Sequence, residues 1–433
     1  MSTKPAGQGP GAKRSKYRAG LLTTSPGETS NLPARHRVGT IWMVIFQAST
    51  IIGIIALMTL LFKVINDSFG YAIISYKTDP ATLVESATPI EELTQNDLIA
   101  ILQVNLTSGR YQTIFKEIAA EDLSQEELVD LVITEVAKPQ VAATFTLLES
   151  IFEKEEIYQY AIDNFPGGFL TFRNWVSIDF VTSPQSSNPL VAGVRNAILA
   201  SLFTIFIAMI FSLPLGVMSA IYLEEYARDN WINRVIRTNI NNLAGVPSII
   251  YGILGLAVFV RVLEPVTSGA MFGIGDSSST ANGRTILSAG LTLGLLVLPL
   301  VIINAQEAIR SVPRSLREAS FGLGGTKWQT VWYHVLPNAI PGTLTGSILA
   351  MSRAIGETAP LVVIGASTFI TYDPNSPFSK FTTLPIQIYQ WTARPQDVWR
   401  KLAAAAIIVL LILLLAMNAI AIYLRNRYTR RLA

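Results

Sequence analysis

The sequence predicts an all-α integral membrane protein with a helical insertion between its first and second membrane-spanning segments. Three observations predict this fold class. Half of the 433 residues are hydrophobic and only 15% are charged, whereas soluble domains carry about 25% charge. Several runs of about 20 residues are apolar throughout, which is the length of a membrane-spanning helix. A strongly acidic stretch separates the first of these runs from the others.

Uncharged apolar runs long enough to cross roughly 30 Å of hydrocarbon predict the individual spans. Five runs are uninterrupted, and a sixth contains only the charges of Arg353 and Glu357. The first run is too long for a signal-peptide core, and the KVINDSFG after it offers no small-residue cleavage site, so we expect a retained anchor. The six predicted spans are residues 41–62, 196–222, 243–260, 285–306, 338–371 and 402–424.

Charge at the two ends of the chain predicts its sidedness. Seven basic residues and one acidic residue precede the first span, and four arginines with no acidic residue follow the last. Because basic flanks stay in the cytoplasm, both termini are expected there, as six crossings require. Residues 1–40, rich in Gly, Pro, Ser and Thr, predict a disordered basic tail, and residues 426–433 a second basic tail.

Residues 67–190 form the acidic stretch, with 19 Asp and Glu against 6 Lys and Arg, a net charge of −13. The predicted sidedness places this segment outside the cell membrane. Ser124 and Glu127 have the spacing of a helix capping box and precede apolar residues at helical intervals, and LTQNDLIAILQ reads similarly. We expect a mainly helical extracytoplasmic domain that ends near residues 165–168. A spacer without chemistry and a docking module both remain open.

Several kinds of chemistry are excluded or disfavoured. The chain has no cysteine, which excludes disulfides, thiolate catalysis and cysteine metal sites, and its two histidines are far apart. The GLGGTK at 322–327 is not a phosphate-binding loop, because Thr326 precedes the lysine and Trp328 follows it. We therefore expect no cofactor, no metal and no enzymatic activity, and any ATP hydrolysis must be carried by a separate chain.

The polar loop at about 307–337 predicts a helix, a turn and a second helix on the cytoplasmic side. Ser315 and Glu318 have capping-box spacing, the glycines at 322–325 break the first helix, and a second apolar-periodic piece ends at Leu336-Pro337. A short helix projecting from a membrane protein suits a groove on a partner. The alternative is an amphipathic loop that only lies at the membrane interface.

The stretch SRAIGETAP places Arg353 and Glu357 in an otherwise apolar segment. A charge at membrane depth costs roughly 2.5–3.5 kcal/mol on insertion scales, so it usually faces a protein interior or a watery path. Four residues apart, the two side chains would share one helix face. Arginine offers a planar set of donors that suits an oxyanion, and the carboxylate would keep the empty site near neutral. A structural ion pair joining two helices is the competing interpretation.

Glycine spacing predicts close helix packing. Gly342 and Gly346 form a GxxxG motif, and Ser248 with Gly252 forms a second small-xxx-small pair. Glu224 and Glu225 lie at the predicted cytoplasmic end of the second span, where we expect them to be solvated.

Two groups of residues carry a resemblance to a known family. Glu318-Ala319-Ser320, Gly324 and Leu336-Pro337 resemble the EAA motif of ABC importer permeases, with serine in place of the second alanine. SRAIGETAPL, IYLEEYA, NLAGVPSIIYGILGL and TLPIQIYQWTARPQ resemble the PstA family, permease subunits of phosphate-specific ABC importers. The resemblance covers nearly everything from residue 190 onward. It does not account for the acidic insertion.

The resemblance implies a six-helix permease bundle over residues 191–425 in a bacterial or archaeal plasma (inner) membrane. It implies that Arg353 and Glu357 take part in phosphate passage. It also implies that Glu318, Ala319, Gly324, Leu336 and Pro337 couple the chain to an ATPase. The implied partners are a PstC-like permease subunit, a PstB-like ATPase dimer and a PstS-like phosphate-binding protein, which the acidic insertion could contact. Importers of other oxyanions, an ion-coupled secondary transporter and a phosphate-status sensor remain alternatives.

Overall fold

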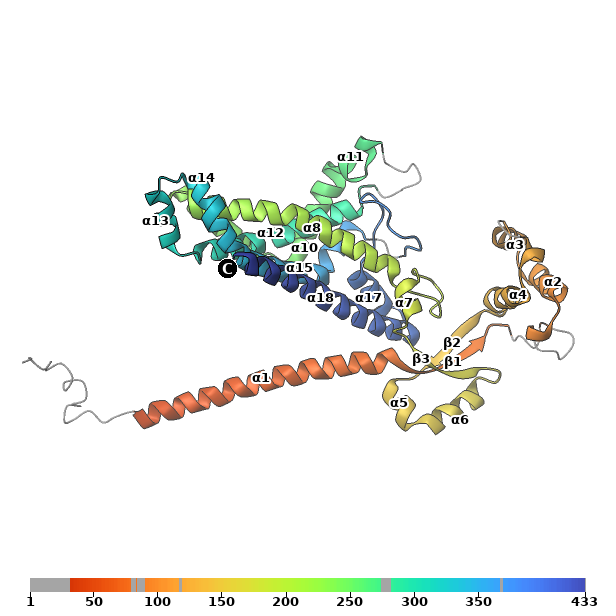
Figure 1. Ribbon diagram of the computed structural model, residues 1–433. Helices are drawn as coiled ribbons and strands as arrows, with labels where there is room; N and C mark the ends of the chain where they lie inside the picture. Colours follow the sequence, from red (N-terminus) through yellow and green to blue (C-terminus); the bar gives the residue numbers. More distant parts are fainter. Residues whose placement is uncertain are drawn as a thin grey trace, which may run out of the picture. The chain divides into compact units, whose positions relative to one another are not determined.

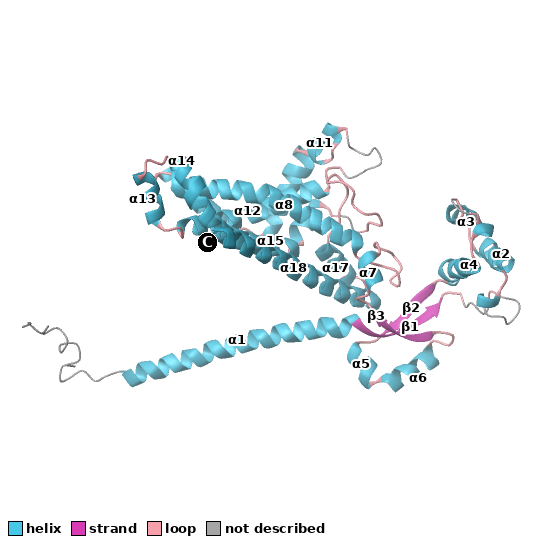
Figure 2. Ribbon diagram, in the orientation of Figure 1, coloured by secondary structure: helices cyan, strands magenta, loops and turns pink. Residues whose placement is uncertain are grey.

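The computed structural model describes residues 32–78, 83, 90–116, 119–273, 282–366 and 369–432 (Figures 1 and 2). The chain divides into two compact units, Met1–Leu61 and Phe62–Ala433. Most of the described residues are helical, with one small sheet, drawn in magenta in Figure 2. The predicted class, a mainly helical protein with several long apolar helices, is confirmed.

The predicted anchor lies within helix α1 (Leu32–Ser68), which is longer than expected. Its large apolar side chains between Val38 and Phe62 are exposed, as suits a helix surrounded by lipid. Most of the predicted disordered tail, residues 1–31, lies outside the described residues. The last part of that prediction, residues 32–40, is helical instead, and the second tail is helical as far as Leu432.

Four described helical segments are long and apolar enough to cross a membrane. They are α1, α8 (Arg195–Ile221) with its π-helical continuation Tyr222–Tyr226, α12 (Ile286–Arg310) and α18 (Asp397–Leu432). A bent pair becomes a fifth crossing if it is counted as one span. The six uninterrupted or nearly uninterrupted spans predicted from hydropathy are therefore found only in part.

Proline explains why two predicted spans are broken. The expected span 243–260 is divided between α9 (Trp231–Ala244) and α10 (Ser248–Gly255), which continues as a π-helix to Val262, and the two meet at 104° beside Pro247. The expected span 338–371 is divided between α15 (Leu336–Gly356) and α16 (Ala359–Ile364). Pro360 lies in the first turn of α16, where its missing amide hydrogen costs no helical hydrogen bond, so it favours the start of a new helix there.

Helix α12 packs against both α8 and α15. A Cβ added at Gly346 would lie 2.2 Å from Asn304 Cβ, and one added at Gly342 would lie 2.8 Å from Ala308 Cβ. The predicted GxxxG motif therefore brings α15 close to α12. Gly290 and Gly294 serve the same purpose between α12 and α8.

The remaining elements of this region are short. A loop on the predicted cytoplasmic side holds α13 (Arg314–Gly322), α14 (Lys327–Thr330) and a π-helical turn, Val331–Val335. The predicted extracytoplasmic side holds α11 (Glu264–Thr267), the 3-10 turn Ala270–Phe272 and α17 (Leu384–Thr392).

The acidic insertion contains a sheet that the helical periodicity did not predict. Strand β1 (Phe69–Tyr76) directly follows α1 and lies between β2 (Pro139–Thr144) and β3 (Phe169–Asn174), antiparallel to both. The expected end of the insertion near residues 165–168 is wrong, because Gly167 turns the chain there at φ 85° and leads into β3. Three short strands from distant parts of the sequence give no local signal of their pairing.

The other elements are α2 (Gln95–Asn105), α3 (Ser108–Ile114), α4 (Gln125–Leu131), α5 (Leu147–Phe152), α6 (Lys154–Asn164), α7 (Ile178–Thr182), a π-helix Val132–Ala137 and 3-10 turns Ile90–Glu92 and Ala120–Asp122.

Residues 90–137 form a lobe with its own apolar core, built from two copies of one motif. LTQNDLIAIL at 93–102 and LSQEELVDLV at 123–132 are 30 residues apart. Each copy follows a 3-10 turn and starts its helix with a complete capping box, so the box predicted at Ser124 is confirmed. Gln95 donates to the Leu123 carbonyl (2.8 Å) and Gln125 donates to the Leu93 carbonyl (3.0 Å). These reciprocal bonds join the two copies to each other.

The sheet end of the insertion packs directly on the last helix. Trp175 and Phe180, which follow β3, share a buried cluster with Trp391 of α17 and Trp399 of α18. Asp67, at the end of α1, lies 3.8 Å from the buried ammonium of Lys401. This end of the insertion is therefore a packed part of the second unit.

Candidate functional site

The break between α15 and α16 holds the two charges predicted to lie on a transport path. Arg353 Nε lies 3.3 Å from Glu357 Oε1, and the two side chains are 43% and 18% exposed. The four-residue spacing brings the two side chains together, as expected, but at the end of the helix. Arg353 belongs to the last turn of α15, whereas Glu357 lies beyond the helix end in an extended conformation (ψ 120°). A cation at a helix C-terminus also interacts favourably with the helix dipole.

Small residues of α10 allow the broken segment to approach closely. A Cβ added at Gly252 would lie 2.6 Å from the Cα of Pro360, which is in the first turn of α16. Tyr251 and Ala354, next to these positions, belong to one buried apolar cluster. The predicted small-residue pair containing Gly252 thus packs against the segment that follows Glu357. Irregular backbone at membrane depth is tolerated where protein buries it or where it lines a watery cavity.

The predicted helix-turn-helix is present in the polar loop, but its caps differ from the prediction. Helix α13 begins after Pro313 with no side-chain cap, so the box expected between Ser315 and Glu318 is absent. Gly324 adopts φ 83°, a conformation that favours glycine. Thr326 then caps α14 through a complete box with Gln329. The turn between the two helices is therefore specified by Gly324 and Thr326.

Ser320, the departure from the EAA pattern, joins the two helices. Its hydroxyl is buried and lies 2.8 Å from the Thr330 hydroxyl. Its carbonyl accepts the Gly325 amide at 2.9 Å, and a Cβ at Gly325 would crowd the serine. The serine therefore holds α13 and α14 together across the turn.

The five predicted coupling residues lie in two places. Glu318, Ala319 and Gly324 are exposed on and after α13, while Leu336 and Pro337 are half-buried at the start of α15. Large apolar side chains are exposed around the first group, and two of them, Trp328 and Trp332, stack with ring centroids 5.4 Å apart. The others are Phe321, Leu323 and Tyr333. Exposed apolar side chains of this kind are typical of interaction surfaces.

Glu224 is the centre of an ion-pair cluster rather than a solvated residue. Its carboxylate is 12% exposed and accepts from Arg237 of α9 (2.8 Å), Arg310 of α12 (2.9 Å) and Gln306 (3.2 Å). The expectation of a solvated interfacial role is wrong because two other helices, α9 and α12, bring three donors to the end of α8. The carboxylate thereby connects α8, α9 and α12.

Glu225 connects the same helix end to α13. It is 10% exposed and lies 2.8 Å from Arg317, which is 17% exposed. Arg317 also donates to the carbonyls of Ile309 (2.9 Å) and Val312 (2.7 Å) at the end of α12. A cavity of about 360 Å³ beside this pair reaches the exposed Glu318 and Phe321. The sequence did contain a signal for these ion pairs. Two adjacent acidic residues follow an apolar run, and each later polar loop contains arginines.

No group of three or more His, Asp or Glu side chains that could hold a metal ion occurs among the described residues. The chemistry of both regions is therefore that of arginine donors and carboxylates.

Comparison with known proteins places both regions in one family. The family model described as "Binding-protein-dependent transport system inner membrane component" matches residues 212–432, which include every predicted site residue and leave the insertion outside. The chain is 35% identical over 217 residues to the probable ABC transporter permease protein YqgI of Bacillus subtilis, covering 50% of this chain and 67% of that one. It is 32% identical over 243 residues to the phosphate transport system permease protein PstA of Yersinia pestis, covering 56% and 75%.

The likeness to solved structures is weaker. A crystal structure of a bacterial alginate ABC transporter with a pentasaccharide-bound periplasmic protein contains a chain that matches with a TM-score of 0.42 and 17% identity. That match covers 65% of this chain and 91% of the other.

Proposed function

Because this chain belongs to the family of binding-protein-dependent transport system inner membrane components, we propose that it is the permease subunit of an ATP-driven importer of inorganic phosphate. As a member of that family it is a multi-pass inner-membrane protein, the permease component and not the ATPase, and it works with an ATPase and a binding protein. Two observations support phosphate as the substrate: the relatives named as phosphate permeases and the Arg353 and Glu357 pair.

In the proposed arrangement, residues 191–425 form half of the translocation path as a six-helix permease bundle with α1. The bent α9 and α10 pair and the broken α15 and α16 pair supply the two crossings that are not continuous helices. Both termini lie in the cytoplasm, and the insertion at 67–190 lies outside. A PstC-like subunit forms the other half, a PstB-like dimer hydrolyses ATP, and a PstS-like protein delivers phosphate.

The Arg353 and Glu357 pair carries the substrate assignment. A guanidinium presents several N–H donors in one plane, which matches two oxygens of a tetrahedral oxyanion. In the empty state Glu357 offsets the charge of Arg353 and reduces the cost of holding a cation at membrane depth. When phosphate enters, its oxygens replace the carboxylate beside the guanidinium, and its hydroxyl donates to Glu357. The Arg353 guanidinium thus pairs with either Glu357 or phosphate, so the site can bind the anion and release it again.

Helix α15 gives a direct mechanical link between this pair and the ATPase. It begins at Leu336 and Pro337 beside the coupling loop and carries Arg353 in its last turn. At 1.5 Å per residue, the 17 residues between Leu336 and Arg353 span about 26 Å. Helix α13 would dock on the ATPase through Glu318, Ala319 and the apolar side chains near Gly324. It would transmit movement of the ATPase into α15. Through the pair of Arg317 and Glu225 it would also transmit this movement into α8.

The test is ATP-dependent uptake of labelled phosphate by proteoliposomes that contain the complete importer. Loss of a hydrogen bond to a charged group costs about 1.5–3 kcal/mol, so Arg353→Lys and Glu357→Gln should each reduce uptake by roughly 10-fold to 100-fold. Arg400→Gln is the matched control, because its pair with Asp397 is exposed. Normal uptake by both Arg353 and Glu357 variants at equal membrane abundance would refute the site assignment.

The same assay separates the alternatives. Equal competition by sulfate or molybdate indicates another oxyanion as substrate, and uptake without ATP indicates an ion-coupled transporter. Altered phosphate signalling with intact uptake in Arg353→Lys indicates a sensor.

A further inference from the structure

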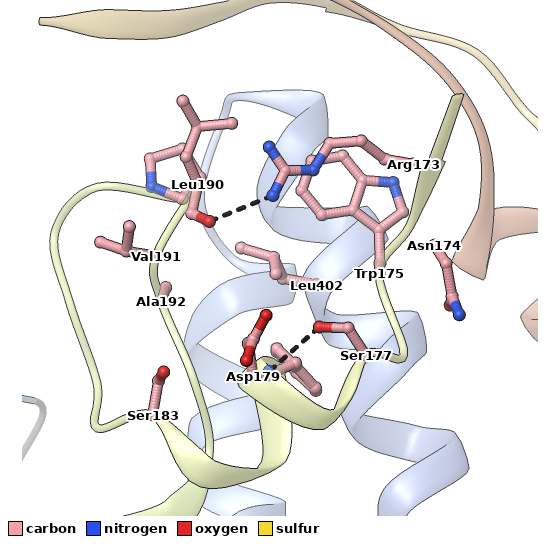
Figure 3. A pocket seen from close by; sticks show the side chains of 12 residues that line it. Arg173, Asn174, Trp175, Ser177, Asp179, Ser183, Leu190, Val191, Ala192 and Leu402 are labelled. Carbon is pink, nitrogen blue, oxygen red and sulfur yellow. Dashed lines mark hydrogen bonds between the residues drawn. The ribbon is translucent and has the colours of Figure 1, made fainter. Parts of the chain in front are cut away.

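A second arginine lies in a pocket far along the sequence from Arg353. The pocket has a volume of about 320 Å³ and is formed by the end of β3, the loop before α8 and the first turns of α18 (Figure 3). Leu402 of α18 closes it with apolar surface, and its polar side chains come from Arg173, Asn174, Ser177, Asp179 and Ser183. None of these residues belongs to the Arg353 and Glu357 pair or to the coupling loop.

Arg173 has fewer partners than its charge requires. Its guanidinium donates to the Leu190 carbonyl at 3.2 Å, and its Cζ lies 5.2 Å from the centre of the Trp175 ring. None of the ion pairs found in the described parts of the chain includes Arg173. A guanidinium has five N–H donors, and a partly buried cation without a counter-ion pays a desolvation cost that a carbonyl and an indole face only partly offset. Burial accordingly lowers the pKa of Arg173.

The other polar side chains define what the pocket can hold. Ser177 is already used, since its hydroxyl accepts from the Phe180 amide at 3.1 Å and caps α7. Asp179 lines the same pocket, and none of the ion pairs among the described residues joins it to Arg173. A ligand here must therefore present acceptors to Arg173 and an O–H donor to Asp179. Hydrogen phosphate has both, and so does the phosphoglycerol headgroup of a lipid.

The pocket lies beside the start of the last apolar helix. Leu402 is in the second turn of α18, close to the start of the apolar span Asp397–Arg427. Trp175, Trp391 and Trp399 form a buried cluster beside it. With the sidedness of the proposed function, on which this placement rests, the pocket opens on the outer surface.

We propose that the Arg173 pocket binds a phosphate-type oxyanion at the outer membrane surface, with Arg173 donating to its oxygens and Asp179 accepting from its hydroxyl. The occupant is either free phosphate waiting above the path or the headgroup of an anionic lipid. Both have the same contacts, and experiment distinguishes them.

The test measures binding rather than transport and uses an Arg353→Gln background, so that failure of the path assignment does not affect it. Delipidated full-length protein is titrated with labelled inorganic phosphate. The same protein in nanodiscs is assayed by native mass spectrometry for retained phosphatidylglycerol, with a neutral glycolipid in parallel. Arg173→Gln should weaken the binding of one of the two phosphate compounds by about 10-fold or more, since charge-assisted hydrogen bonds are lost.

Two further variants guard against misfolding. Val191→Glu adds a negative charge at the rim of the pocket, where the valine is 57% exposed, and should weaken binding without disturbing the core. Arg234→Gln, on α9, removes an exposed arginine that pairs with Asp229 and should change nothing. Binding of phosphate alone identifies free phosphate, and retention of phosphatidylglycerol alone identifies lipid. Absence of both, or equal binding by Arg173→Gln and Val191→Glu, would overturn the proposal.

Discussion

Replacing Arg317 by methionine should uncouple ATP hydrolysis from transport while leaving the permease folded. Arg317 connects three elements, since it pairs with Glu225 at the end of α8 and donates to two carbonyls at the end of α12 from its own position on α13. Methionine keeps much of the side-chain volume but supplies none of these donors. Glu225 would then remain buried without its counter-charge.

The magnitude follows from the burial of this pair. Removing one partner of a buried ion pair costs about 3–5 kcal/mol, because the remaining charge is left uncompensated. Both side chains retain some exposure, 17% and 10%, so we take the lower end, about 3 kcal/mol, or roughly a 100-fold change in the equilibrium between docked and released α13. Replacing both partners by apolar residues should cost much less, since no charge stays buried.

The assay is the number of phosphate ions transported per ATP hydrolysed in reconstituted importer, with hydrogen exchange of residues 314–322 as the structural readout. Arg317→Met should lower the transport ratio and accelerate exchange in α13. The double variant Arg317→Met with Glu225→Leu should recover much of both. Arg234→Met, which breaks an exposed pair with Asp229, is the matched control.

Two results would refute this reasoning. An unchanged transport ratio in Arg317→Met would mean that the pair does not hold α13. A double variant as impaired as the single one would mean that the loss comes from missing hydrogen bonds and not from a stranded carboxylate.

Three other predictions follow from packing, motif pairing and titration. Gly346→Leu should reduce folded protein in detergent thermal melts, because its side chain would overlap Asn304, whereas Gly356→Leu, with open space around it, should have little effect on folding. Gln125→Ala removes the hydrogen bond to the Leu93 carbonyl, which should cost roughly 1 kcal/mol of the stability of the lobe. Hydrogen exchange should therefore accelerate in both α2 and α4, and unchanged exchange would contradict the pairing of the two motifs. Hydrogen bonds from Ser124 lower the pKa of Glu127. The stabilisation that this capping box gives to α4 should therefore be complete above the ordinary carboxyl pKa, and it should be lost as the pH falls through the lowered pKa of Glu127. The acid-induced rise in exchange at α4 should be smaller in Ser124→Ala.

The sequence by itself determined the membrane class, the long apolar helices, the helix-turn-helix of the coupling loop and the capping box at Ser124. These features depend on hydropathy, charge and residue spacing within a short window, and such local properties can be read directly. The repeat of LTQNDLIAIL and LSQEELVDLV was also visible in the sequence, but only the reciprocal glutamine bonds showed that the two copies form a pair.

Tertiary structure alone decided which charges meet. The acids at 224 and 225 precede their arginine partners by 13 to 92 residues, so no local pattern could assign the pairs. The sheet in the insertion likewise joins strands about 70 to 100 residues apart in sequence, as the register of β1 with its two neighbours shows. The segment after α15 packs against Gly252 of α10, which is another contact between residues far apart in sequence. Contacts made across long sequence separations come from packing of the whole chain, and residue spacing contains no record of them.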